Sequence, residues 1–208
     1  MNIAICVPCR DQVDTGFAFD LALAMSFHVA NSNDHVWLFH SKGTLICNQR
    51  QELAKEAIQK GADWILYLDS DMRFPKDTIR RLLAHGETVV AANYSTRRAP
   101  IKPVAFKKPN LDDRAYTEAD STGLEEVFGV GMGVFLVKVS ALLEVPLPWF
   151  QIGYSKGLED FVGEDIYFCR ALKEAGNTVW IDHDLSKQVR HVGTMEYETQ
   201  HACILKEQ

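Results

Sequence analysis

The chain contains a short apolar run, residues 64–68, that ends directly in Asp69-Ser70-Asp71. Five consecutive apolar residues predict a strand buried on both faces, as in a parallel sheet. Ligands of open parallel sheets bind beyond the carboxyl ends of the strands, where Asp69 and Asp71 stand. If the strand continued through them, both carboxylates would point the same way and would need a cation to offset their repulsion. A divalent metal that keeps coordination sites for phosphate oxygens fits this position.

The alternative is that Asp69-Ser70-Asp71 forms a solvated turn before the next helix, which Pro75-Lys76-Asp77 is expected to open. Both interpretations agree with the residue types, because aspartate and serine are common in turns. The apolar strand immediately before the two aspartates favours the metal and phosphate site.

Size and charge limit the other classes of function. The 208 residues, 47% of them hydrophobic, suffice for one α/β domain with a full core. The net charge of −6 gives no indication of binding to nucleic acid or to an anionic membrane. No apolar run approaches the roughly 20 residues of a transmembrane helix. An anionic ligand in such an acidic protein needs a metal or a few basic residues nearby.

The cysteines are odd in number and scattered along the chain. Cys6 and Cys9 form a Cys-x-x-Cys pattern that occurs in redox and zinc sites, but no second cysteine pair completes a zinc site. We interpret all of them as reduced structural thiols, Cys203 included, and we expect a cytoplasmic protein. Met1-Asn2-Ile3 leads straight into a strand, so no signal peptide is expected.

The first half of the chain alternates between strand and helix patterns. Apolar runs predict strands at residues 2–8, 35–40, 64–68 and 88–93, and helical periodicity predicts helices at 17–29, 45–60 and 75–85. This order implies a parallel, doubly wound sheet. Arg10 follows the first strand and Arg50 lies near a helix start, so both can approach a bound phosphate; a surface loop and a solvent ion pair are the alternatives.

The second half is less regular. Residues 103–107 predict an edge strand, and residues 126–138 predict one strand that contains Gly129, Gly131 and Gly133. We interpret these glycines as leaving room for a sugar or an acceptor, with a simple bulge as the alternative. Further segments follow in order: loops at 109–123 and 151–162, a helix that begins at 163–165 and ends at 176, a strand at 178–182 and a short segment at 189–193.

The order of four motifs is typical of one family: Asp69-Ser70-Asp71 after a strand, the Gly-rich strand, Gly163-Glu164-Asp165 at a helix start, and His191-Val192-Gly193. Over about residues 2–193 the chain resembles the family 2-like glycosyltransferases of the GT-A (nucleotide-diphospho-sugar transferase) fold. The resemblance implies a single α/β domain with a mixed, mainly parallel sheet flanked by helices. Its parts would be a nucleotide-binding half at about 1–98, an acceptor-side half at about 99–193 and a tail at 194–208.

The resemblance also implies the metal site. Asp71 would bind Mn²⁺ or Mg²⁺ directly, and Asp69 would contact the ribose or sugar, or the metal through water. The late metal-binding histidine of the family falls on His191, with His183 as its rival. The aspartate that reads the base in the family is not evident, because His40-Ser41-Lys42 stands at its position. The donor-binding set implied in this way comprises Pro8, Arg10, Arg50, Asp69, Ser70, Asp71, Gly131 and Gly133.

The implied activity is metal-dependent transfer of a sugar from a nucleoside-diphosphate sugar to a hydroxyl of a glycan, lipid or protein. The metal would neutralise the leaving diphosphate, with Arg10, Arg50, Arg97 or Arg98 assisting. Asp165 would be the general base of an inverting reaction and Glu164 would orient it; a retaining reaction stays open. Two alternatives are a non-catalytic sugar-nucleotide or glycan-binding domain and a sugar nucleotidyltransferase. The second needs a glycine-rich, basic loop after the first strand, which residues 9–14 do not provide.

Overall fold

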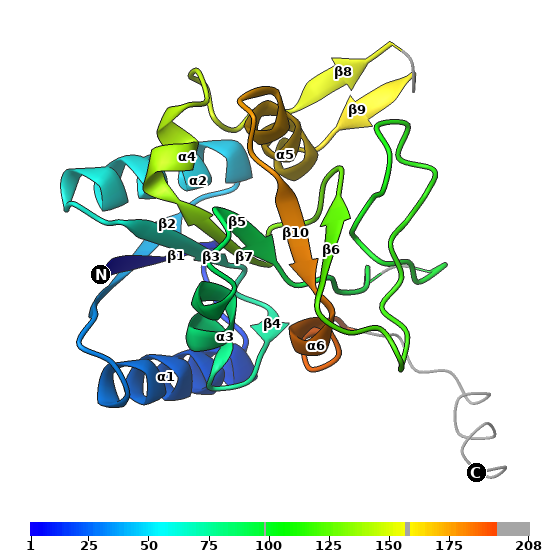
Figure 1. Ribbon diagram of the computed structural model, residues 1–208. Helices are drawn as coiled ribbons and strands as arrows, with labels where there is room; N and C mark the ends of the chain where they lie inside the picture. The colour runs from blue at the N-terminus through cyan, green and yellow to red at the C-terminus, as the bar shows by residue number, and fades with distance from the viewer. Residues whose placement is uncertain (98, 157–158, 195–208) are drawn as a thin grey trace, which may run out of the picture.

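A seven-stranded sheet forms the centre of the computed structural model, which describes residues 1–97, 99–156 and 159–194 (Figure 1). Arg98, Cys203 and the expected tail from residue 195 onward lie outside these described residues. The strand order is β2-β1-β3-β7-β5-β10-β6. The strands are β1 (Asn2–Cys9), β2 (His35–Lys42), β3 (Trp64–Leu68), β5 (Val89–Ala91), β6 (Leu124–Val127), β7 (Val134–Lys138) and β10 (Val179–Asp182).

The sheet is mixed and mainly parallel, which confirms the predicted fold class. β1 runs parallel to β2 and to β3, and β5 runs parallel to β10. β7 is antiparallel to both β3 and β5, so these two strands run in the same direction. β6 is antiparallel to β10 at the edge. The sheet therefore joins strands from both predicted halves of the chain.

Helices cover both faces of this sheet (Figure 1). Apolar residues of α2 (Ile46–Gln59), α4 (Val139–Leu143) and α5 (Glu164–Glu174) pack on one face. Those of α1 (Thr15–Ala30), α3 (Thr78–Ala84) and α6 (His183–Ser186) pack on the other. The central strands alternate their side chains between the two layers, as in Ile65 and Tyr67 against Leu66 and Leu68. None of the helices in the described part of the chain has the length and apolar composition of a membrane span.

Four local predictions were wrong. Residues 126–138 are not one strand, because β6 and β7 are separated by residues 128–133. Residues 103–107 form only isolated bridges. The expected loop at 151–162 contains β8 (Gly153–Ser155) and β9 (Asp160–Val162), which pair with each other. The third helix begins at Thr78, not at Pro75, whose carbonyl instead accepts hydrogen bonds from the Thr78 amide and hydroxyl.

A small second sheet brings the end of the chain to the predicted site. β4 (Met72–Arg73) pairs antiparallel with β11 (Arg190–His191), so that Met72 lies opposite His191. The amide of Val192 also donates to the carbonyl of Asp71 at 2.8 Å. This pairing joins segments about 120 residues apart and places His191 next to Asp71.

Candidate active site

A cavity of about 740 Å³ lies where β1, β2 and β3 end, at the carboxyl edge of the parallel strands. Its volume is in the usual range for a small-molecule site. Every residue predicted for the site lines this cavity except Gly131 and Gly133. The topology thus brings together residues from position 8 to position 191.

Asp69-Ser70-Asp71 forms a turn and not a continuation of β3. The amide of Asp69 donates to the carbonyl of Gly133 at 3.0 Å, and the amide of Met72 donates back to the carbonyl of Asp69 at 3.1 Å. β3 ends at Leu68, so the extended strand that would point both carboxylates the same way does not continue through them. The turn does not cap α3 either, since the N-cap residue of that helix is Asp77. Each of the two carboxylates has cationic partners of its own.

Asp71 lies beside His191, with 3.5 Å between Oδ1 and Nε2. Nδ1 of His191 is 3.0 Å from the carbonyl of Ser95, which can only accept, so Nδ1 carries a proton. Nε2 is then the nitrogen that faces Asp71 and is available to a metal. Burial raises the pKa of Asp71, but the hydrogen bond to His191 and the charge of Arg97 lower it below its usual value.

The residues present fit a Mg²⁺ or Mn²⁺ ion that binds together with a diphosphate. Such ions use one or two carboxylates and take further ligands from substrate phosphates and water. Oδ1 of Asp71 and Nε2 of His191, 3.5 Å apart, are the protein atoms that would hold such an ion. Within the described ranges, no cluster of three or more His, Cys, Asp or Glu side chains could hold a metal without added ligands.

Arg97 is the other partner of Asp71. Its Nη1 lies 2.7 Å from Oδ2 of Asp71 and donates to the carbonyl of Val192 at 3.3 Å. About half of the Arg97 side chain is exposed to solvent. The guanidinium thus holds the carboxylate oxygen that does not face His191, while part of the side chain stays accessible from solvent.

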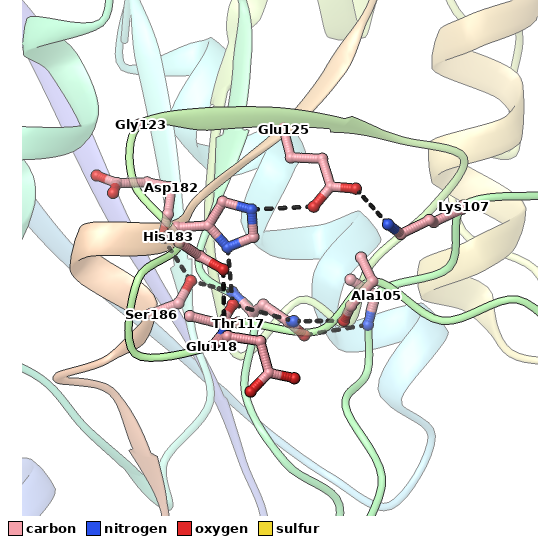
Figure 2. A network of polar contacts seen from close by, with 12 residues as sticks. Ala105, Lys107, Thr117, Glu118, Gly123, Glu125, Asp182, His183 and Ser186 are labelled. Carbon is pink, nitrogen blue, oxygen red and sulfur yellow. Dashed lines mark hydrogen bonds and ion pairs between the residues drawn. The ribbon is translucent and has the colours of Figure 1, made fainter.

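His183, the rival to His191, lies in a separate polar network (Figure 2). Its Nδ1 is 2.9 Å from Oγ1 of Thr117, and its Nε2 is 2.9 Å from a carboxylate oxygen of Glu125. The other oxygen of Glu125 pairs with Lys107 at 2.8 Å. Both ring nitrogens of His183 are therefore engaged, and the residue does not line the cavity. Of the two histidines, only His191 lies beside Asp71.

Arg50 bridges two carboxylates. Its side chain is buried on α2, its Nη2 donates to Asp69 at 2.9 Å, and its Nη1 donates to Glu164. Nε has no hydrogen-bond partner among the described residues. A buried guanidinium needs opposite charges around it, and Arg50 takes them from Asp69 and Glu164, not from a solvent ion pair. Arg50 also lines the cavity, and its approach to a phosphate stays a prediction. Sequence reasoning missed this bridge.

Asp165 lies in the cavity wall on the first turn of α5, as predicted. Its Oδ1 accepts a hydrogen bond from the amide of Ile166 at 2.8 Å. Burial and the neighbouring charge of Glu164 raise the pKa of Asp165 to about 6, while the charge of Arg50 acts in the opposite direction. A carboxylate with such a pKa is a better proton acceptor near neutral pH than an ordinary aspartate.

Tyr94 fills the space that the glycines were expected to leave for a sugar. A Cβ atom on Gly131 would lie 2.5 Å from the Tyr94 hydroxyl, and one on Gly133 would lie 2.8 Å from its ring. The amide of Gly133 donates to that hydroxyl at 3.1 Å, and the ring packs edge-on against His191. Tyr94 lines the cavity and was not predicted. The signal in the sequence that could have identified Tyr94 is its position directly after the predicted strand at 88–93, at the edge where such sheets bind ligands.

Comparisons with known proteins show the fold. No family model and no curated protein matches the sequence. A197 from STIV aligns with a TM-score of 0.59 and 15% identity over 97% of this chain and 100% of that one. GalNAc-T7, solved with UDP, GalNAc and Mn²⁺, aligns with a TM-score of 0.63 and 12% identity over 94% of this chain and 44% of that one.

The catalytic domain of Drosophila beta1,4galactosyltransferase 7, solved with xylobiose, aligns with a TM-score of 0.53 and 14% identity. The alignment covers 97% of this chain and 78% of that one. At these identities the similarity establishes the fold and not the activity. The chain therefore has a GT-A-like fold, as the sequence motifs predicted.

Proposed function

We propose that this protein, which has a GT-A-like fold, is a metal-dependent glycosyltransferase. It would move a sugar from a nucleoside-diphosphate sugar to an acceptor hydroxyl. One observation carries the proposal: a single cavity contains both the Asp71–His191 pair and the carboxyl group of Asp165. Glycosyl transfer needs these two functions in one place. The leaving diphosphate must be neutralised, and the attacking hydroxyl must lose a proton.

The donor would bind with its diphosphate near Asp71, His191 and Arg97. A bound Mn²⁺ or Mg²⁺ supplies charge neutralisation of the diphosphate as it leaves. Arg97, whose side chain is half exposed at this position, would supply a further positive charge to the leaving group. Asp69, whose carboxylate is oriented by Arg50, would accept hydrogen bonds from the ribose or sugar. Pro8 and Arg10 line the nucleotide side of the same cavity.

The acceptor hydroxyl would be activated by Asp165. Its carboxylate takes the proton while the acceptor oxygen forms a bond to the anomeric carbon and the bond to the diphosphate breaks. The anomeric carbon carries positive charge in such a transition state. Direct attack from the side opposite the diphosphate gives inversion. Glu164, held by Arg50, would keep Asp165 and the acceptor in position.

The structural neighbours support this proposal by analogy. GalNAc-T7 was solved with a nucleotide, a sugar and Mn²⁺, and the galactosyltransferase was solved with a disaccharide. The corresponding ligands proposed for this chain are a nucleoside-diphosphate sugar, a divalent ion and a glycan, lipid or protein acceptor. The sugar transferred would be a hexose or a related sugar.

A second candidate is a sugar-nucleotide-binding domain without catalytic activity. The observation that favours it is the 2.7 Å ion pair between Arg97 and Asp71, which occupies one oxygen of the expected metal ligand. In that case the nucleotide would bind without a metal and would not be turned over.

Calorimetric titration of UDP, GDP, CDP and dTDP, with Mn²⁺ and with EDTA, tests both candidates. We expect tight binding of one diphosphate that requires Mn²⁺ and is lost in Asp71→Ala. The matching nucleotide sugar should then be consumed by the wild type, while Asp165→Asn binds it normally and transfers no sugar. Metal-independent binding without turnover would support the second candidate. Absence of binding by all four diphosphates would contradict both.

A further inference from the structure

A second cavity, of about 500 Å³, adjoins the candidate active site. The two cavities share Tyr94, Arg97 and His191 in their walls. From this shared wall the second cavity extends along Pro100, Lys102 and Arg114, away from the residues that follow β1 and β2. We call it the basic groove, defined by Arg97, Lys102 and Arg114.

The charge of the basic groove is opposite to that of the first cavity. Three cationic side chains line it, and no carboxylate does among its described lining residues. The first cavity is lined by three arginines, which are Arg10, Arg50 and Arg97, but also by five carboxylates: Asp14, Asp69, Asp71, Glu164 and Asp165. In a chain of net charge −6, a concave surface with only basic charged groups indicates an anionic ligand.

The backbone that carries these cations is held in place. The amide of Thr96 donates to the carbonyl of Lys102 at 2.8 Å, and the amide of Lys102 donates to the hydroxyl of Thr96 at 3.1 Å. Arg114 donates to the carbonyl of Pro103, and its guanidinium lies 4.3 Å from the ring centroid of Phe106. The backbone of Lys102 and the guanidinium of Arg114 are therefore held in place by these contacts.

Lys102 is the cation whose charge is available to a ligand. Its side chain is exposed, and no ion-pair partner for it is present in the described part of the chain. The neighbouring lysines differ in this respect, since Lys107 pairs with Glu125 and Lys108 pairs with Asp113. An ammonium without a carboxylate partner does not have to break an ion pair when a phosphate binds to it, although it gives up part of its hydration.

We propose that the basic groove binds a phosphate group carried by the acceptor, so that the substrate class is a phosphorylated acceptor. This inference rests on the proposed glycosyl transfer. The diphosphate of the donor already has Asp71, His191 and Arg97 as its site, whereas Lys102 and Arg114 lie outside the first cavity. A phosphate on Lys102 and Arg114 would hold the rest of the acceptor at the wall that the two cavities share.

The test is a titration of inorganic phosphate into ¹⁵N-labelled protein, followed by the NMR shifts of the backbone amides. It is made on the free protein and on protein saturated with Mg²⁺ and the nucleoside diphosphate that binds best. We expect phosphate to shift the amides of Lys102, Val104 and Ala105 in both samples. Lys102→Gln should weaken binding by about 5-fold, the upper end for an exposed ion pair, and Lys102→Arg should restore it. Lys55→Gln, on an exposed part of α2, is the matched control.

Two results would overturn the proposal. Equal phosphate affinity in the wild type and Lys102→Gln would show that the groove does not bind the anion. Competitive displacement of phosphate by the nucleoside diphosphate would assign the groove to the donor. A different result would concern the proposed function: if no nucleoside diphosphate binds, glycosyl transfer is contradicted, while Lys102-dependent phosphate binding to the free protein would still support the anion site.

Discussion

Arg50 donates a hydrogen bond of 2.9 Å to Asp69, and its other terminal nitrogen reaches Glu164. One buried cation thereby links the end of β3 to the first turn of α5. The two carboxylates belong to the donor side and the acceptor side of the proposed reaction. The relative position of these sides depends on this one guanidinium.

Replacing Arg50 by Gln should destabilise the protein by about 3 kcal/mol, because removal of one partner leaves buried opposite charges uncompensated. Chemical denaturation of the wild type and Arg50→Gln measures this loss. Arg81→Gln is the control, since Arg81 pairs with Asp77 at 4.0 Å on the surface and should change stability by less than about 0.5 kcal/mol. A similar, small effect in both variants would contradict a structural role for the bridge.

The raised pKa of Asp165 predicts a pH-dependent stability. In the unfolded chain the carboxyl ionises near its usual pKa of 3.8, but in the folded protein it ionises at about 6. Protonation of Asp165 therefore favours the folded state. This contribution to the free energy of unfolding is fully present below about pH 4 and is lost as the pH rises to about 6. Relative to Asp165→Asn, the wild type should lose roughly 2–3 kcal/mol across this range. Parallel curves for the two proteins between pH 4 and pH 6 would show that the pKa is ordinary.

His191 and His183 should respond differently to replacement by alanine. His191→Ala should weaken Mn²⁺ binding by at least about tenfold, a loss that even outer-shell partners of a metal can cause. His183→Ala should leave Mn²⁺ binding unchanged and destabilise the fold by about 2 kcal/mol, because Thr117 and Glu125 lose their buried partner. Mn²⁺ titration and thermal unfolding of both variants separate the two roles. A larger metal defect in His183→Ala would reverse the assignment.

Gly133→Ala should destabilise the protein by about 1–3 kcal/mol through overpacking. The added Cβ would lie 2.8 Å from the ring of Tyr94 and 2.9 Å from the sulfur of Met72, and Met72 is fully buried. Gly153→Ala is the control, since a Cβ there meets nothing within 4 Å. Thermal unfolding checks the difference, and equal melting temperatures would mean that Tyr94 moves away at little cost.

Arg97→Gln should change the binding of metal and of nucleotide in opposite directions. Without the competing guanidinium, Mn²⁺ alone should bind Asp71 about 2–5-fold more tightly, the range of an exposed ion pair. The Mn²⁺–diphosphate complex should bind more weakly, because a cation near the leaving group is lost. Calorimetry with Mn²⁺ alone and with both ligands measures the two effects. Arg170→Gln, which removes a surface pair with Glu174 and a contact with the ring of Tyr167, should change neither.

Much of the fold and of the site follows from local sequence patterns. The strand at residues 64–68 and the helix start at Glu164 were predicted correctly, because apolar periodicity and residues at helix ends act over a few positions. Nine of the eleven residues predicted for the site line one cavity. Residues after parallel strands meet at one edge whatever the strand order is.

Other features were decided only by the tertiary structure. No local sequence pattern predicts the bridge from Arg50 to Glu164, because the two residues are 114 positions apart. The sequence also does not specify that Tyr94 fills the space beside Gly131 and Gly133, since a glycine leaves room but does not indicate which side chain occupies it. Pairing of β4 with β11 places His191, and not His183, beside Asp71, because strand register is set by long-range packing. The sequence by itself thus determined which chemical groups reach the edge of the sheet, and packing decided which of them meet.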